Sequence, residues 1–220
     1  PDNGLPGWDR ISGYYYPDST IAGFSHTHLS GTGAGDLYDI SYMPVTLPYR
    51  EAEAPLGIHS KFRHSDEEAS AGYYRVLLKD YNINVELTAT ERCGIQRYTF
   101  PKAQSAVFLN LKKAMNWDFT QDSHIEVVDS CTIQGYRFSD GWARGQRVFF
   151  RTRFSKPFRS SEIDTTAIIQ DGKTIGTAYV ARFNFDTTDG EEIVLCTALS
   201  GVSMEGCLLY TSPSPRDPKT

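Results

Sequence analysis

The sequence predicts an all-β protein in which the strands form one large antiparallel β-sandwich. Short apolar runs of strand length recur along the chain, and turn residues such as Gly, Asn and Asp separate them. Several of these runs alternate apolar with polar or charged residues, which is typical of strands with one buried face. No segment shows the long helical period of an amphipathic helix. Many short strands at regular spacing favour a sandwich of antiparallel sheets.

The expected strands follow one another in chain order. Residues 37–43 come after a glycine-rich segment and are predicted to form a strand. Residues 73–78 and 83–88 flank the turn sequence KDYN, and residues 167–170 and 174–185 flank DGK, so each pair predicts a hairpin. Further strands are expected at residues 106–111, 124–128, 131–138, 147–154 and 192–197. The charged residues 52–71 are predicted to form a loop.

Composition limits the classes of function. The chain has 220 residues, with 40% apolar and 22% charged residues, an ordinary globular composition. The net charge of −5 argues against a nucleic-acid-binding surface. No long uncharged apolar run is present, so no membrane span is expected. Aromatic residues make up 13% of the chain, which suits strand packing and also suits the stacking of rings on sugars.

The cysteines and the paired acids form no recognisable catalytic or metal motif. None of the four cysteines (Cys93, Cys131, Cys196 and Cys207) belongs to a C-x-x-C pair, so neither a structural zinc site nor a disulfide framework is predicted. Each cysteine is expected to act as a small apolar residue. The acid pairs Glu67-Glu68 and Glu191-Glu192 are expected to be solvated loop charges.

The two ends of the chain differ from the rest. The sequence begins with PDNG, which is typical of the middle of a loop. Residues 207–220, CLLYTSPSPRDPKT, are rich in Ser and Pro and have no period, and they are predicted to be a non-native or disordered tail. Residues 1–206 are therefore expected to carry the fold.

The stretch from residue 25 to residue 36, SHTHLSGTGAGD, has three competing interpretations. As a metal site, His26 and His28 would share one face of a strand, with Asp36 and Asp39 as further ligands, but no other His or Cys cluster completes the set. As a phosphate cradle, GTGAGD lacks the Lys-Ser/Thr of a P-loop and precedes a predicted strand, whereas a phosphate loop opens a helix.

The third interpretation is one wall of a pocket for a hydroxyl-rich ligand. His26, His28, Ser30 and Asp36 supply hydrogen-bond donors and acceptors, and Trp8 lies nearby in sequence. The glycines would let the backbone approach a ligand closely, although they also suit a plain tight turn.

Residues 7–45, GWDRISGYYYPDSTIAGFSHTHLSGTGAGDLYDISYMPV, resemble the N-terminal domain of glycoside hydrolase family 92, the calcium-dependent exo-α-mannosidases. Residues 62–74 (FRHSDEEASAGYY), 85–101 (VELTATERCGIQRYTFP) and 199–206 (LSGVSMEG) are also similar to the family. The resemblance covers residues 1–206, and it identifies the chain as a part of that domain truncated at both ends.

The resemblance implies a two-domain enzyme, in which the β-sandwich precedes a helical (α/α) barrel and the active site lies between them. Inverting hydrolysis needs one carboxylic acid to protonate the leaving oxygen and one carboxylate to activate water. In the family both come from the helical domain, as do the main ligands of the Ca²⁺ ion that grips the mannose hydroxyls. That domain is missing here, so no catalytic residue and no metal ligand is assigned to this chain, and the fragment alone is expected to be inactive.

Five residues take a substrate-binding role by resemblance. Trp8 matches a tryptophan that contacts the sugar on the leaving-group side. His26, His28, Ser30 and Asp36 are expected either to line the pocket or to brace the loop that faces the helical domain by hydrogen bonding.

Two main hypotheses about function follow. The first is a fragment of an inverting exo-α-mannosidase, an α-1,2-mannosidase, that removes terminal mannose from glycans and is secreted, periplasmic or on the outer surface. Its partners are mannose-containing glycans and its own C-terminal domain. The alternative is a non-catalytic mannose-binding β-sandwich module. A third hypothesis, a structural β-sandwich that binds no ligand, holds if the residues of SHTHLSGTG serve only to form a turn.

Overall fold

The computed structural model describes residues 13–28, 37–49, 57–114 and 118–211, and for residues 209–211 it describes the backbone only. Strand is by far the commonest regular structure of these residues, which confirms the predicted all-β class. The elements are, in chain order, β1 Thr20–Ile21, β2 Ser41–Thr46, β3 Ser60–Lys61, the short 3₁₀ helix η2 His64–Asp66, β4 Glu67–Ser70, β5 Tyr73–Leu78, β6 Ile83–Ala89, β7 Cys93–Phe100, β8 Ala103–Asn110, β9 Phe119–Asp129, β10 Thr132–Asp140, β11 Gln146–Phe154, β12 Ser160–Gln170, β13 Lys173–Thr187, β14 Glu191–Ser200 and the helix α1 Met204–Thr211.

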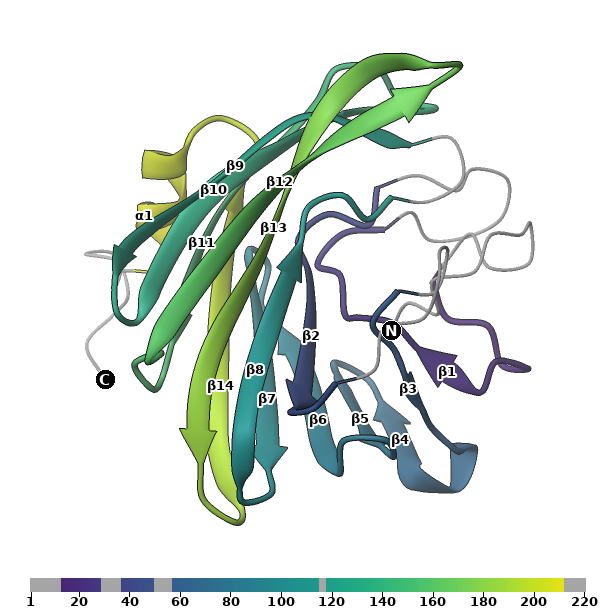
Figure 1. Ribbon diagram of the computed structural model, residues 1–220, viewed down its shortest axis with the longest axis vertical. Helices are drawn as coiled ribbons and strands as arrows, with labels where there is room; N and C mark the ends of the chain where they lie inside the picture. Colours follow the sequence, from purple (N-terminus) through teal and green to yellow (C-terminus); the bar gives the residue numbers. More distant parts are fainter. Residues whose placement is uncertain (1–12, 29–36, 50–56, 115–117, 212–220) are drawn as a thin grey trace.

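Two antiparallel sheets form the sandwich. The larger sheet has the strand order β4-β5-β6-β7-β14-β11-β10-β9, and the smaller has the order β12-β13-β8-β2. Strands β1 and β3 form a separate two-stranded pair. Figure 1 shows the long, curved strands β12 and β13 crossing the front of the larger sheet. The predicted sandwich architecture is therefore confirmed.

The core lies between the two sheets and is rich in aromatic rings. Phe154 and Phe158 come from the β11 side, and Phe183 and Phe185 come from β13. The ring centroids of Phe158 and Phe183 are 5.1 Å apart, and those of Phe154 and Phe183 are 5.4 Å apart. Each such pair adds about 0.5–1.5 kcal/mol beyond the burial of its area. Strand packing thus accounts for many of the aromatic residues.

Both predicted hairpins are present, and their turns have the expected backbone. Strands β5 and β6 pair from Tyr73↔Thr88 to Leu78↔Ile83, and β12 pairs with β13 up to Gln170↔Lys173. Asp171 (φ 49°) and Gly172 (φ 73°) both adopt positive φ between β12 and β13. A two-residue hairpin turn with positive φ at both central residues matches the twist of the strands, which is why Asp-Gly predicts it well.

Two predictions about local structure were wrong. Residues 60–70 are not loop but contain β3, η2 and β4, because Glu67–Ser70 pairs with β5 despite its charges. The strand predicted at residues 37–43 begins only at Ser41, since Leu37, Tyr38 and Ile40 have φ of 76°, 76° and 56°. Residues in this left-handed region cannot continue a strand.

The helix α1 lies against β14, β11 and β10 (Figure 1). It spans the boundary predicted between residues 206 and 207, and Cys207 is fully buried against Cys93 and Ala198. The assignment of residues 207–220 to a non-native or disordered tail stays a prediction.

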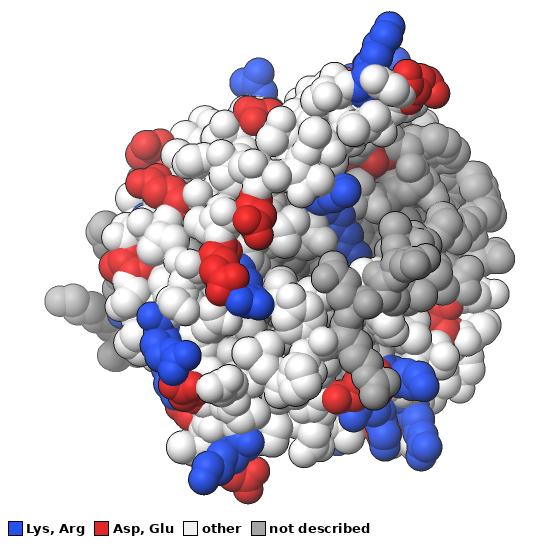
Figure 2. Space-filling model, viewed as in Figure 1, with Lys and Arg blue, Asp and Glu red and all other residues white. Residues whose placement is uncertain are grey.

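Charged side chains are spread over the surface. Figure 2 shows Lys and Arg interspersed with Asp and Glu over the visible face of the described residues, without a continuous field of one sign. Among the same residues, no helix has the length and apolar character needed to cross a membrane.

Candidate functional site

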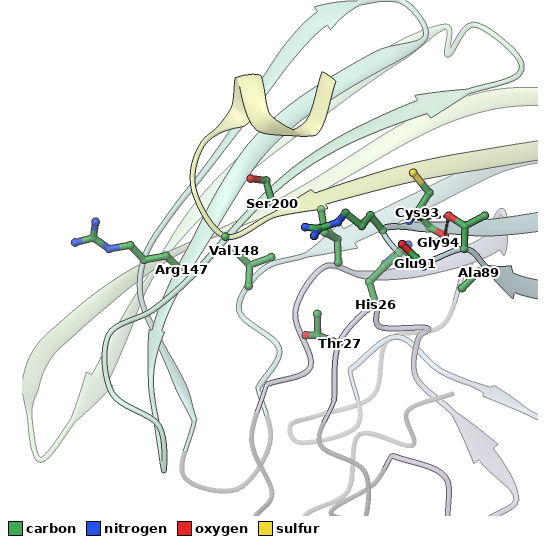
Figure 3. A pocket seen from close by; sticks show the side chains of 13 residues that line it. His26, Thr27, Ala89, Glu91, Cys93, Gly94, Arg147, Val148 and Ser200 are labelled. Carbon is green, nitrogen blue, oxygen red and sulfur yellow. Dashed lines mark hydrogen bonds between the residues drawn. The ribbon is translucent and has the colours of Figure 1, made fainter. Parts of the chain in front are cut away.

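A pocket of about 320 Å³ lies at one end of the larger sheet. Four segments line it, namely residues 26–27, the β6–β7 turn with its flanks at residues 89–94, the beginning of β11 at residues 147–148, and the end of β14 at residues 199–201. Figure 3 shows His26 and Thr27 on one side of the pocket and Val148 and Ser200 on another. Segments far apart in sequence therefore meet here because antiparallel strands bring their ends together.

The imidazole of His26 has a defined orientation in the pocket wall. Its Nδ1 lies 2.7 Å from the carbonyl oxygen of Ile40. A carbonyl oxygen only accepts, so Nδ1 carries the proton and Nε2 is left as an acceptor. The side-chain amide nitrogen of Gln96 lies 3.4 Å from Nε2, and the ring meets Tyr42 edge-on at 5.7 Å. His26 is thus held by the Ile40 carbonyl, the Gln96 amide and the Tyr42 ring.

Gly94 packs directly under the His26 ring. A Cβ built on Gly94 would lie 2.4 Å from Cδ2 and 2.8 Å from Nε2 of His26. Only a residue without a side chain permits this approach. The glycine in ERCG is therefore a structural requirement of the pocket wall.

Thr27 connects the pocket to a buried ion cluster. Its hydroxyl donates to Asp39 Oδ2 at 2.6 Å, and Asp39 Oδ1 accepts from Arg137 Nη1 at 2.6 Å. Arg137 also donates to Asp118 through Nη2 and to Thr120 Oγ1 at 2.9 Å through Nε. The Arg137 side chain is 0% exposed, so its charge depends on these partners. Burial raises the pKa of Asp118 to about 6, although the Arg137 guanidinium opposes this shift.

The other walls supply groups that suit hydroxyl ligands. Glu91 and Arg92 lie in the β6–β7 turn, and the backbone N–H of Leu199 donates to the carbonyl of Arg92 at 3.1 Å, which ties this turn to β14. Ser200 lines the pocket at the end of β14, and its hydroxyl oxygen accepts hydrogen bonds from the backbone N–H groups of Val202 and Ser203 at 3.1 and 3.4 Å. The Arg147 guanidinium points away from the other labelled side chains in Figure 3, and it lies 5.4 Å from the centre of the Phe138 ring.

Carboxyl groups are scarce among the described residues around the pocket. Glu91 is the only carboxylic acid among the described residues that line it, whereas inverting hydrolysis of a glycoside needs two carboxyl groups. Within the described ranges, no group of three or more His, Cys, Asp or Glu side chains has the arrangement of a metal site. The described residues around the pocket therefore do not fit a Ca²⁺ ion.

The cysteines are thiols without a nucleophilic environment. All four are free, and Cys93 and Cys207 are buried. Burial raises the pKa of Cys207 to about 11, and burial likewise raises the pKa of Cys196. A thiol with a raised pKa is a poor nucleophile near neutral pH. Cys207 therefore behaves as a small apolar side chain, as the sequence predicts.

The structure brings only part of the predicted site together. His26 lines the pocket, and its Nδ1 is bonded to the Ile40 carbonyl, while its role in substrate binding stays a prediction. His28 is exposed and does not line the pocket, because the segment is not a regular strand that would put both histidines on one face. Trp8, Ser30 and Asp36 lie outside the described residues.

Sequence reasoning missed several residues of the site. Thr27, Glu91, Arg92 and Ser200 line the pocket but carry no local motif that would single them out. The segments that carry these four residues become neighbours only when the chain folds. A signal did exist at Thr27, since it lies between the two histidines that were selected.

A second polar cluster, away from the pocket, corrects the prediction for Glu67. This carboxylate is not a solvated loop charge, since its side chain is 11% exposed. It accepts hydrogen bonds from Tyr14 and Tyr74, each at 2.8 Å, and it pairs with His64 at 2.5 Å. Burial works to raise the pKa of Glu67, but the bonds from His64, Tyr74 and Tyr14 leave it lowered. The cluster fixes β4 to the preceding segment.

These observations define a class, a domain made of a two-sheet antiparallel β-sandwich with a pocket at one end of its larger sheet. Residues 1–200 match the family model of the glycosyl hydrolase family 92 N-terminal domain. The chain belongs to this family and corresponds to that domain.

Solved structures agree with this assignment. The chain is 32% identical to the family GH92 α-mannosidase BT3965 from Bacteroides thetaiotaomicron, solved in complex with mannoimidazole, with a TM-score of 0.83 over 94% of this chain and 29% of that one. The inverting mannosidase BT2199 from B. thetaiotaomicron VPI-5482 shares the fold, with 21% identity and a TM-score of 0.75 over 100% of this chain and 29% of that one. The family GH92 glycosyl hydrolase ccman5 also shares it, with 24% identity and a TM-score of 0.69 over 90% of this chain and 28% of that one. No curated protein sequence matches the chain.

The chain spans less than a third of the length of these solved relatives. The activity, substrates and partners of the whole protein are therefore taken up as proposals.

Proposed function

We propose that this chain is the N-terminal domain of an inverting exo-α-mannosidase, an α-1,2-mannosidase, that removes terminal mannose from glycans. The pocket around His26 would form one wall of the substrate site, and the helical domain beyond this chain would complete it. The observation that carries the proposal is this pocket in a domain 32% identical to an α-mannosidase solved with mannoimidazole. Export from the cytoplasm belongs to the same proposal and rests on family membership alone.

The pocket's own residues suggest a division of labour between the domains. The His26 imidazole and the charged pair Glu91 and Arg92 suit hydrogen bonding to sugar hydroxyls. Such contacts orient a substrate, whereas protonation of the leaving oxygen and activation of water need a pair of carboxyl groups. In this proposal the chain binds and orients, and the helical domain supplies the acid and the base.

The isolated chain tests the proposal against its alternative. We expect the purified chain to release no mannose from an α-1,2-linked mannobiose and to show almost no binding of mannose by NMR titration. Release of mannose would contradict the division of labour. Saturable mannose binding at millimolar concentration, with the residues of the pocket shifted, would favour the non-catalytic mannose-binding module.

A chimera provides the positive test. Residues 1–200 would replace the N-terminal domain of BT3965, and the hybrid would be assayed with α-mannosides. We expect mannosidase activity, with His26→Ala lowering kcat/KM about tenfold, as the loss of one strong hydrogen bond does. His28→Ala is the matched control, since His28 is exposed and outside the pocket. Equal effects of the two substitutions would exclude the pocket as the substrate wall.

A further inference from the structure

Residues 37–40, beside the pocket, have a strained backbone that other contacts must stabilise. Leu37, Tyr38 and Ile40 all have φ in the left-handed region, between 56° and 76°. This conformation is costly for residues with a side chain, and most of all for a β-branched residue such as Ile. It persists only where the surroundings determine it. The fourth residue of the segment, Asp39, carries the side chain that reaches into the core.

The same segment holds His26 at two points. The backbone N–H of His26 donates to the carbonyl of Asp39 at 3.0 Å, and Nδ1 of its ring donates to the carbonyl of Ile40 at 2.7 Å. Thr27 bonds the Asp39 carboxylate at 2.6 Å, and the N–H of Tyr38 donates to the carbonyl of Thr27 at 3.0 Å. The position of the imidazole thus depends on where the Asp39–Ile40 backbone lies.

Asp39 is itself fixed from the other side of the sandwich. Arg137, on β10 of the larger sheet, donates to Asp39 Oδ1 at 2.6 Å across a sequence separation of 98 residues. Its other groups donate to Asp118, to Thr120 and to the carbonyl of Leu111, so the guanidinium has no freedom to turn. Both Arg137 and Asp39 have side chains at most 1% exposed. A planar guanidinium with several fixed acceptors is a rigid anchor, which an ammonium group cannot copy.

We infer that Arg137 is a positioning residue, which acts through Asp39 to hold the strained 37–40 segment and so sets the tautomer and orientation of His26 in the pocket wall. This role deepens the proposed function, because it concerns the same pocket. It does not depend on any ligand, since the contacts exist in the chain by itself.

The test reads the imidazole of His26 directly by ¹⁵N NMR of the full chain. In the wild type we expect one tautomer for His26, with the proton on Nδ1, while exposed His28 serves as an internal reference. Arg137→Lys keeps the charge but loses the forked geometry, and we expect loss of the single Nδ1–H tautomer in a chain that still melts cooperatively. Arg151→Lys is the matched control, since Arg151 bonds Gln134 on the same sheet outside the cluster.

Asp39→Asn is the second variant and keeps the proposal falsifiable if Arg137→Lys does not fold. It removes one charge from a cluster in which Asp118 still neutralises Arg137. Loss of the His26 tautomer in either folded variant, with His28 unchanged, supports the positioning role. An unaltered His26 signal in every variant that folds overturns it. Failure of both variants to fold also overturns it, because the cluster would then serve folding as a whole.

The outcome is separable from the proposed function. A chain that binds no sugar in any assay still gives a tautomer result for His26. Conversely, a mannosidase chimera that works with Arg137→Lys and unaltered kcat and KM would refute the positioning role and leave the proposed function standing.

Discussion

Replacement of Gly94 by Ala tests the geometry of the pocket wall most directly. The new Cβ would lie 2.4 Å from Cδ2 of His26, whereas carbon atoms in favourable contact are about 3.5–4.0 Å apart. One of the two groups must therefore move by about 1 Å. The ring cannot simply swing away, because Nδ1 is bonded to the Ile40 carbonyl and the ring edge packs on Tyr42.

The magnitude follows from two opposing effects. Overpacking of this kind costs about 1–3 kcal/mol. Ala recovers about 0.5–1 kcal/mol relative to Gly inside a strand, since it loses less backbone entropy on folding. We therefore expect Gly94→Ala to lower the free energy of unfolding by about 1–2 kcal/mol. For a chain of this size, this lowers the Tm by about 2–8 °C.

Calorimetry gives the Tm, and the ¹⁵N spectrum of His26 shows whether the imidazole has moved. Gly201→Ala is the matched control, because Gly201 also lines the pocket and a Cβ added there would meet no atom within 4 Å. We expect the control to leave both the Tm and His26 unchanged. A Gly94→Ala chain with the wild-type Tm and an unshifted His26 signal would refute the packing described above.

Three further substitutions test the core. Tyr42→Phe removes a hydroxyl 2.6 Å from Thr152, so we expect a loss of about 1 kcal/mol in urea unfolding, and an unchanged midpoint would argue against that bond. Gly135→Ala would put a Cβ 1.9 Å from the backbone oxygen of His124, so we expect a loss of about 3 kcal/mol or an insoluble chain, and a wild-type melt would be inconsistent with this strand pairing. Asp118→Asn removes a carboxylate whose burial raises its pKa from 3.8 to about 6. The stability of the wild type therefore falls as the pH rises through this window and the buried carboxyl group ionises. The variant's stability relative to wild type should rise by about 2 kcal/mol from pH 4 to pH 6 and then level off, and a constant difference would contradict the shift.

The sequence predicts well those parts of the fold whose conformation depends on residues close together in the sequence. Asp171-Gly172 predicts a hairpin because both residues tolerate the positive φ that the turn needs. The alternating pattern of residues 147–154 likewise predicts a half-buried strand, and β11 has that form. In both cases the cause lies within a few residues of the effect.

The 37–40 segment shows where such reasoning fails. Its residues are mostly apolar and favour a strand, so the local pattern predicts one. The left-handed backbone is selected instead by a tertiary contact, the bond from Asp39 to an arginine 98 residues away. Glu67 is a similar case, because its partners Tyr14 and Tyr74 lie on other segments and convert an expected surface charge into a buried acceptor.

The same distinction applies to the pocket. The resemblance selects His26 because the histidine lies within a recognisable string, but it cannot separate His26 from His28, which differ only in what surrounds them after folding. The surroundings of His26 are Gly94 beneath the ring, the carbonyl of Ile40 at Nδ1 and the amide of Gln96 near Nε2. These three residues come from different parts of the chain. None of them, taken singly in the sequence, indicates a ligand-binding site. A pocket wall made in this way is a property of the sandwich as a whole, which explains why its remaining members, such as Arg92 and Ser200, emerge only from the structure.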